Sequence, residues 1–164
     1  MLNLLGKSAA RKAFTQGLCD QLVARARAPV FFRELAISDS IDGRFDLMAL
    51  HGWLVLERLK GPAAQALTDM IFTSFDEALR EQGTGDMGMG RKMKAMADAF
   101  FGRLVAYRDA RDQDQLAAAL ARNVWRGAAP GAEAKRLAAY VASARAALAA
   151  ANIEGGVLDF GPLP

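Results

Sequence analysis

The amino-acid sequence predicts an all-α fold, namely a single-domain bundle of about six helices with an extended C-terminal tail. Apolar residues recur every three or four positions along nearly the whole chain, which is the spacing of an amphipathic helix. Glycine and proline fall between these stretches and separate them. The alternating pattern of a strand is missing, apart from two short candidates at residues 30–32 and in the tail.

The first predicted helix spans residues 5–28 and is followed by an irregular segment. The residues of its apolar stripe are Phe14, Leu18, Leu22 and Ala26. Pro29 ends this helix, and the next segment, VFFRELAISDSIDG, closes with too many Ser, Asp and Gly residues for regular structure. Ser40 or Asp42 then supplies the N-cap of a second helix, which runs to Lys60.

Four further helices are predicted after Gly61, with Pro62 at the first helical position, where its missing N–H is harmless. The third spans residues 63–82, and its apolar stripe consists of Leu67, Ile71, Phe75 and Leu79. The fourth spans residues 90–110, and its buried side is marked by Ala97, Phe100, Phe101, Leu104 and Tyr107. Asp112 or Asp114 caps the fifth, which ends at Trp125 before Gly127, and the sixth spans residues 132–151.

Composition is typical of a globular protein that can bury a core. The 164 residues are 52% hydrophobic and 24% charged, which is close to ordinary globular usage and does not indicate disorder. The net charge of +3 suits an anionic partner without requiring one. Cys19 is the single cysteine, so an internal disulfide is excluded, and its amphipathic surroundings predict a small buried group. No apolar run reaches the roughly 18 residues of a membrane-spanning helix.

The N-terminal residues carry only basic charge. Lys7, Arg11 and Lys12 all precede the first acidic residue, Asp20. This pattern resembles a transit peptide, although the apolar h-region of a secretory signal is missing. A basic amphipathic first helix also explains the pattern, and we favour that interpretation.

Residues 83–94 read GTGDMGMGRKMK and match G-x-G-x-x-G, the glycine pattern of dinucleotide-binding proteins. That motif needs a strand before the glycines, whereas the preceding segment is strongly helical, so we reject a nucleotide site. A phosphate loop is rejected too, because Arg91 and Lys92 stand where it has Lys and Ser/Thr. We expect Gly83 to end one helix and Asp86 to help cap the next.

Residues suited to catalysis or metal binding are scarce. His51 is the single histidine and lies far from Cys19 in the sequence, so no zinc-type cluster can be assembled, and a nucleophile–histidine site would have to use His51. The apolar surroundings of His51, LMALHGWLVLERLK, favour a hydrogen-bonded core histidine over a general base. Asp76 and Glu77 are adjacent on a helix and therefore point to different faces. We expect no enzyme, no metal and no cofactor.

Basic residues and methionines alternate after the glycine segment. The basic residues are Arg91, Lys92 and Lys94, and the methionines are Met87, Met89, Met93 and Met96. Methionine packs against irregular shapes, so this composition suits a surface for an anionic or apolar partner. The structural alternative is a solvated charged face with methionine in the core. The basic patches alone predict only weak electrostatic association with RNA or an anionic membrane surface.

Several motifs resemble the ubiquinol–cytochrome c chaperone family over residues 40–163. The pattern H-x-W-x-x-x-x-R-x-K, formed by His51, Trp53, Arg58 and Lys60, is similar to the central helix of that family. The segments that continue the resemblance, in the same order, are FDEALREQGTGDMG, GRKMKAMADAFFGRLVAYRDA, LAAALARNVW and the tail GGVLDFGPL. Residues 1–35, the predicted N-terminal helix, match the family less clearly.

The resemblance implies a non-enzymatic assembly chaperone for ubiquinol–cytochrome c reductase, the respiratory complex III. Its client would be newly made cytochrome b, the membrane-embedded subunit. Mitochondrial relatives work with a small helical partner protein and sit near the ribosomal exit tunnel, which makes both candidate partners here. The implied place is the inner membrane periphery, on the cytoplasmic side in a bacterium or the matrix side in a mitochondrion. One histidine cannot supply paired axial ligands, so we expect no haem, and DNA is not an expected partner.

We predict that the client surface combines residues of the central helix and of the fourth helix. These residues are His51, Trp53, Arg58, Met89, Arg91, Lys92 and Met93. For Trp53 we rank core packing ahead of direct contact, and for Arg58 a structural ion pair with a nearby acid remains open. The competing class is a ribosome- or RNA-binding adaptor at the membrane surface, which would show salt-sensitive binding to ribosomes that lack a nascent chain.

Overall fold

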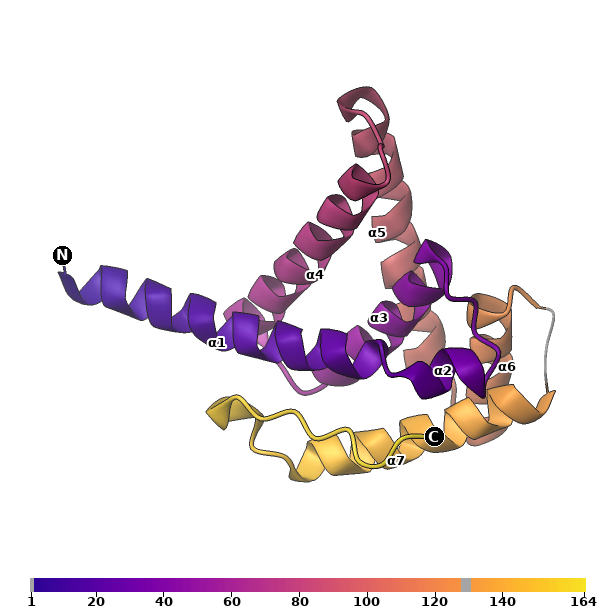
Figure 1. Cartoon of the computed structure of the whole chain (residues 1–164). Helices are drawn as coiled ribbons and strands as arrows, with labels where there is room; N and C mark the ends of the chain where they lie inside the picture. Colours follow the sequence, from indigo (N-terminus) through magenta and orange to yellow (C-terminus); the bar gives the residue numbers. More distant parts are fainter. Residues whose placement is uncertain (1, 128–130) are drawn as a thin grey trace.

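The computed structural model describes residues 2–127 and 131–164, with side chains from residue 6 onward. Helices follow one another along these residues and no strand occurs among them, which confirms the predicted all-α fold (Figure 1). The elements are α1 Leu2–Ala26, α2 Pro29–Arg33, α3 Ile41–Leu56, α4 Gly61–Glu81, α5 Asp86–Asp109, α6 Gln113–Val124, α7 Gly131–Ala150 and the 3-10 turn η1 Ile153–Gly155. Six of the helices are long and correspond to the six predicted, whereas α2 is a single short turn.

The central element of the fold is α3, which contacts α1, α4, α5, α6 and α7. Every residue from Phe45 to Val55 is buried, so the helix is surrounded on all sides. Its start is fixed by Ser40, whose hydroxyl accepts a hydrogen bond from the Gly43 amide over 3.2 Å, which confirms the predicted cap. The helix ends at Leu56, earlier than predicted, because residues 57–60 form the turn into α4.

The helices α4 and α5 form a hairpin that projects from the rest of the molecule (Figure 1). The chain reverses at Gly83, whose φ of +81° lies in the left-handed region that favours glycine. The Gly83 amide donates to the carbonyl of Arg80 over 2.9 Å, and the Thr84 amide donates to that of Leu79 over 3.1 Å. These bonds satisfy the last carbonyls of α4, so Gly83 ends the helix as predicted.

Helix α5, which corresponds to the fourth predicted helix, begins at Asp86, whereas the sequence predicted a start at Gly90. The left-handed Gly83 completes the reversal within a few residues, so the glycines at 88 and 90 continue the helix. The N-cap is Gly85 and no side chain caps it, so the predicted capping by Asp86 is wrong. The Asp86 carboxylate instead lies 3.0 Å from the guanidinium of Arg80 across the turn.

Residues 30–32, one of the two strand candidates, form part of α2. Pro29 occupies the first helical turn, where its missing N–H leaves no bond unmade. Phe31 is completely buried and its carbonyl accepts a hydrogen bond from the Ile37 amide over 3.2 Å. The short helix α2, five residues long, thus directs the ring of Phe31 into the core. The tail is extended, as predicted, but pairs with no strand in the described part of the chain.

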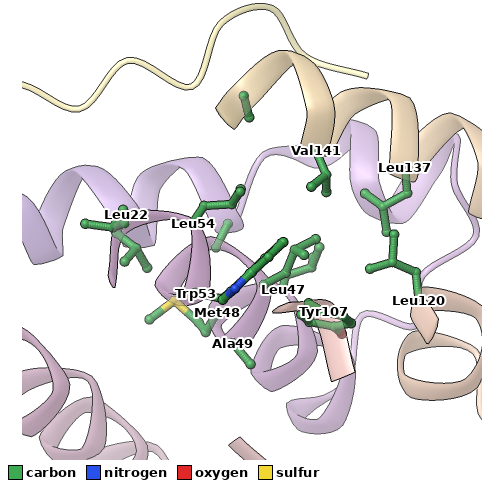
Figure 2. Close-up of a cluster of buried hydrophobic side chains, with 14 of the residues drawn as sticks. Leu22, Leu47, Met48, Ala49, Trp53, Leu54, Tyr107, Leu120, Leu137 and Val141 are labelled. Atoms are coloured by element: carbon green, nitrogen blue, oxygen red, sulfur yellow. The ribbon is translucent and has the colours of Figure 1, made fainter. Parts of the chain in front are cut away.

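The core surrounds α3 and is completed by α1, α5, α6 and α7 (Figure 2). The rings of Trp53 and Tyr107 pack together with their centroids 5.4 Å apart, at a tilt of 53°. Cys19 is buried, as predicted. The predicted stripe of α4 is confirmed, because all four of its members are buried: Leu67, Ile71, Phe75 and Leu79.

The buried side of α5 is narrower than predicted. Phe100 and Tyr107 are buried, as expected, whereas Phe101 is 50% exposed. Neighbouring residues of a helix point about 100° apart, so Phe100 and Phe101 cannot both face the same core. The phenyl ring of Phe101 rests against that of Phe100, with the centroids 5.4 Å apart, and leaves its other side at the surface.

Candidate functional site

The structure divides the predicted contact residues into buried and accessible ones. His51, Trp53 and Met89 are 0%, 3% and 6% exposed. Their side chains are buried, so they offer no surface to a partner in this structure. The remaining four lie at the surface or at its edge: Arg58, Arg91, Lys92 and Met93. Whether these four touch a partner stays a prediction.

His51 belongs to a buried chain of hydrogen bonds that joins three helices. Its Nδ1 lies 2.7 Å from the carbonyl oxygen of Leu47, and its Nε2 lies 2.8 Å from the hydroxyl of Tyr140 on α7. The Nε of Arg25 on α1 donates to that same hydroxyl over 2.9 Å. Because a carbonyl can only accept, Nδ1 carries the proton and Nε2 accepts from Tyr140. Burial lowers the pKa of His51 to about 4, so the ring is neutral at pH 7.

Trp53 lies beneath a surface ion pair. The guanidinium of Arg145 on α7 lies 5.2 Å from the centroid of the Trp53 ring, and it also lies 2.9 Å from the Glu57 carboxylate. Arg58 is exposed and borders a hollow of about 310 Å³ beside this pair. Glu57, the acid nearest to Arg58 in the sequence, pairs with Arg145. The structure therefore gives no support to the ion pair considered for Arg58.

An open groove lies between α1 and the hairpin formed by α4 and α5. Its first hollow has a volume of about 580 Å³ and is lined by residues of α1, α3 and α4, with Met96 of α5 at one side. A second hollow of about 560 Å³ shares Phe45, Leu79 and Met96 with the first and continues along α5. We call these two adjoining hollows the hairpin groove.

The hairpin groove has an apolar floor and a charged rim. The apolar side chains that line the floor include Val23, Phe45, Met48, Phe75, Leu79 and Met96. Exposed charged residues of both signs stand at the rim of the first hollow: Asp20, Arg27, Arg44, Glu77 and Glu81. Lys92, one of the predicted contact residues, lines the second hollow, where its ammonium donates to the Thr84 hydroxyl over 2.9 Å. Such a groove suits an apolar segment that carries polar flanks.

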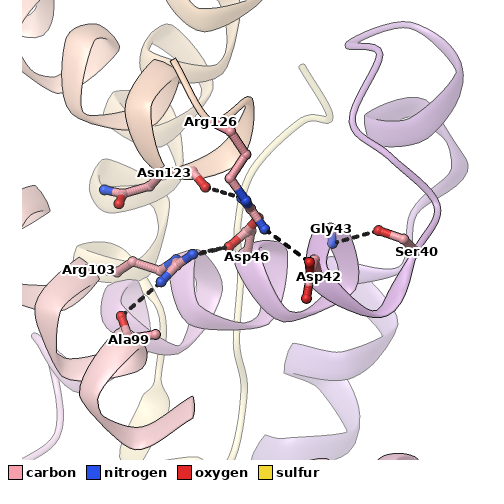
Figure 3. Close-up of polar contacts among 8 residues, drawn as sticks. All are labelled: Ser40, Asp42, Gly43, Asp46, Ala99, Arg103, Asn123 and Arg126. Atoms are coloured by element: carbon pink, nitrogen blue, oxygen red, sulfur yellow. Dashed lines mark hydrogen bonds and ion pairs between the residues drawn. The ribbon is translucent and has the colours of Figure 1, made fainter. Parts of the chain in front are cut away.

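A buried carboxylate lies between two arginines beside the second hollow (Figure 3). Asp46 on α3 is fully buried, and its Oδ1 lies 2.7 Å from the Nη2 of Arg103 on α5. Its Oδ2 lies 2.6 Å from the Nη1 of Arg126, just beyond α6. Burial raises the pKa of the Asp46 carboxyl, and the guanidiniums of Arg126 and Arg103 oppose that effect. Both arginines also line the second hollow, so this triad fixes part of the groove wall.

Arg126, one member of the triad, has an unusual backbone conformation. Its φ of +55° is left-handed, which is unusual for a residue with a side chain. In this conformation Arg126 turns back towards α3 and reaches Asp46 as well as Asp42, whose carboxylate lies 3.7 Å away. The triad was not predicted from the sequence. The one available signal was Asp46 itself, a single acid within the apolar run FDLMAL.

Ionisable side chains are dispersed over the described residues. These residues contain no group of three or more His, Cys, Asp or Glu side chains placed to hold a metal ion. Burial raises the pKa of the Cys19 thiol, which keeps it in its less reactive form. In the same part of the chain, no helix combines the length and the apolar character required to cross a lipid bilayer.

Comparison with known proteins identifies the family. The family model described as ubiquinol–cytochrome C chaperone matches residues 33–155. The chain belongs to the ubiquinol–cytochrome c chaperone family. A ubiquinol–cytochrome c chaperone acts in the assembly of respiratory complex III, so this chain is an assembly chaperone of that complex. The match contains all of α3–α7, including the hairpin and the Asp46 triad.

A solved structure of a family member has the same fold. It is the crystal structure of the Cbp3 homolog from Brucella abortus, which is 36% identical in sequence and superimposes with a TM-score of 0.77. The similarity covers 89% of this chain and 87% of that one. No curated protein sequence matches the chain.

Proposed function

We propose that this ubiquinol–cytochrome c chaperone binds newly made cytochrome b and holds an apolar segment of it in the hairpin groove. The family membership supports the assembly role, and the hairpin groove is the observation that carries the client proposal. Its two hollows have volumes of about 580 and 560 Å³, and its floor is formed by apolar side chains from four helices. A transmembrane subunit exposes such apolar segments before its own partners are in place.

The composition of the groove fits a client segment of imperfect shape. Met48 and Met96 both face the groove, and their unbranched, polarizable side chains adapt to irregular surfaces. The hairpin supplies one wall and meets the rest of the protein mainly through α1 and α3, so small shifts of α4 or α5 would adjust the width. The charged rim would meet the polar residues that flank an apolar segment.

The groove is too small to enclose a whole membrane subunit. Each hollow is of the size that holds a drug-like ligand or a few side chains. The groove would therefore serve as an anchor for one segment of the client. The exposed basic residues at the start of α5, Arg91 and Lys92, would add contacts with the client or with the membrane surface where the client is inserted.

Co-purification from detergent extracts tests the client proposal. A tagged chain is expressed in cells that make ubiquinol–cytochrome c reductase, and cytochrome b is quantified in the eluate. We expect enrichment over an unrelated helical protein with the same tag, and enrichment should persist at high salt because the groove floor is apolar. Recovery equal to the control would overturn the proposal. Salt-sensitive recovery of ribosomes without a nascent chain would favour the competing RNA-binding class.

A further inference from the structure

The C-terminal tail is bound to the body of the protein in the manner of a peptide ligand. Beyond η1 it forms no regular structure, and its backbone is held by side chains of the helices. The Gln21 amide on α1 donates to the Gly156 carbonyl over 2.8 Å and accepts from the Leu158 amide over 2.9 Å. One side chain thus satisfies a backbone acceptor and a backbone donor, as a neighbouring strand would. This contact involves only backbone atoms of the tail, and it includes Gly156, whose φ of +84° is left-handed.

A second clamp binds the backbone further along the tail. The Nη2 of Arg25 lies 3.3, 2.6 and 2.9 Å from the carbonyl oxygens of Phe160, Gly161 and Pro162. The Nε of the same side chain donates to Tyr140, so the guanidinium is oriented from inside the protein. Three successive carbonyls gathered on one cation form a strong contact that again involves only backbone atoms.

One side chain of the tail serves as an anchor. The ring of Phe160 is 5% exposed and meets the His51 ring edge to face, with centroids 5.4 Å apart at 73°. By contrast Val157 and Leu163 are about half exposed. Glycine is favoured after the anchor, because Gly161 has a φ of +65°, a conformation that side chains strain. Backbone clamps, one aromatic pocket and a favoured glycine are the parts of a peptide-recognition site.

We propose that the face formed by α1 and α7 is a peptide-binding site that the tail fills in cis. In trans it takes an extended segment of a partner protein that carries an aromatic residue followed by glycine. The site lies on the opposite side of α1 from the hairpin groove, since Gln21 and Arg25 face the tail whereas Asp20 and Val23 line the groove. It is therefore independent of the cytochrome b proposal.

The covalent link explains why the tail occupies its own site. A segment joined by a short linker competes at an effective concentration of about 1 mM, so a free peptide at micromolar concentration is excluded while the tail is seated. The segment that competes in a cell would need a similar local concentration, which a partner protein bound elsewhere on the chain would provide.

Cleaving the tail after folding tests the proposal directly. A protease recognition sequence is inserted at the exposed turn between Gly155 and Gly156, and the folded full chain is cut. The cut protein is then mixed with a labelled peptide of residues 156–164, and binding is measured by fluorescence anisotropy. We expect the cut body to keep its helical circular dichroism and to exchange its tail for the peptide. The uncut chain should bind the peptide at least a hundredfold more weakly.

Two altered peptides examine the recognition rule. Phe160→Ala removes the anchor and should weaken binding to the cut body at least tenfold, and Gly161→Ala should do the same through its backbone conformation. Loss of helical signal after the cut would overturn the proposal, because the tail would then be part of the folding unit and not a ligand. Equal binding of all three peptides, or no exchange by an intact cut body, would overturn it as well.

Discussion

The hydroxyl group of Tyr140 lies 2.8 Å from Nε2 of His51, in the interior where α7 crosses α3. Arg25 donates to this hydroxyl from α1, and the opposite ring nitrogen of His51 donates to the Leu47 carbonyl, so the polar groups form one continuous chain. Each donor has an acceptor only while the imidazole is neutral. The single histidine of the protein is therefore a structural connection between helices, and its geometry excludes a free general base.

The first prediction is that stability depends on pH through His51. Its pKa in the folded protein, about 4, lies below the 6.5 of an unperturbed histidine, so the unfolded chain binds the proton more tightly. The stability that the neutral His51 contributes is fully present above about pH 6.5 and is lost as the pH falls towards 4. The free energy of unfolding, measured by urea denaturation, should fall by about 1.4 kcal/mol per pH unit in this range.

A variant without the imidazole provides the control. Because the sequence has no other histidine, His51→Gln should show a nearly flat free energy of unfolding between pH 7.5 and 5.5. An identical slope in the variant and in the natural chain would show that carboxylates cause the pH dependence.

The second prediction concerns the buried carboxylate of the triad. Asp46→Ala leaves the guanidinium of Arg103 without its partner in a largely buried place, and such a loss costs about 3 kcal/mol in unfolding free energy. The matched control is Asp39→Ala, which breaks the exposed pair with Arg44 and should cost less than about 1 kcal/mol. Urea denaturation at pH 7 compares them, and equal costs would refute the structural role of Asp46.

The sequence predicted most of the fold because helical periodicity dominates it. The stripe from Leu67 to Leu79 and the caps at Ser40 and Asp112 act within one helix, so local pattern specifies them. It failed where the outcome depends on tertiary contacts. Residues 30–32 have the composition of a strand, yet they form part of the short helix α2. In this helix the side chain of Phe31 is buried in the core.

The candidate site was less accessible to sequence reasoning. Motif resemblance singled out His51 and Trp53, but their periodicity cannot tell a helix buried on all sides from one with an exposed face. The Asp46 triad joins residues 57 and 80 positions apart in the chain, so no local spacing reveals it. The hairpin groove likewise arises from how α1, α3, α4 and α5 are placed, which the helix pattern alone does not specify.

The third prediction is that Gly43 cannot be replaced. A Cβ at this position would lie 1.8 Å from the backbone oxygen of Ser38, so Gly43→Ala forces the loop before α3 to move. We expect the free energy of unfolding, measured by urea denaturation, to fall by about 3 kcal/mol, the upper end of the cost of overpacking. Gly102→Ala is the matched control, because nothing lies within 4 Å of its Cβ. Removing glycine from that exposed helical position should stabilise the protein by about 0.5–1 kcal/mol.

The fourth prediction tests the basic start of α5. Arg91 and Lys92 are exposed, so the double change to Glu should alter the unfolding free energy by less than about 0.5 kcal/mol. We expect co-purified cytochrome b to fall several-fold, because two attractive charges become repulsive ones. The same charge change on exposed Arg122 and Lys135 is the control and should leave recovery unchanged. Equal recovery with both double variants would remove the α5 patch from the client surface.

The fifth prediction is that obstructing the hairpin groove prevents client binding. Ala78 on α4 lines the first hollow, and Ala78→Arg would place a long charged side chain across its apolar floor. We expect recovery of cytochrome b to fall at least tenfold while the thermal melting temperature changes little, because the hollow is open to solvent.

Thr73→Arg is the matched control for the groove. Thr73 is exposed on the same helix and does not line the groove, so this variant adds the same side chain and charge elsewhere on α4. Its recovery of cytochrome b should equal that of the natural chain. If both arginine variants bind the client equally well, the client lies elsewhere on the protein, and the exposed side chain of Phe101 on the outer face of α5 becomes the next surface to alter.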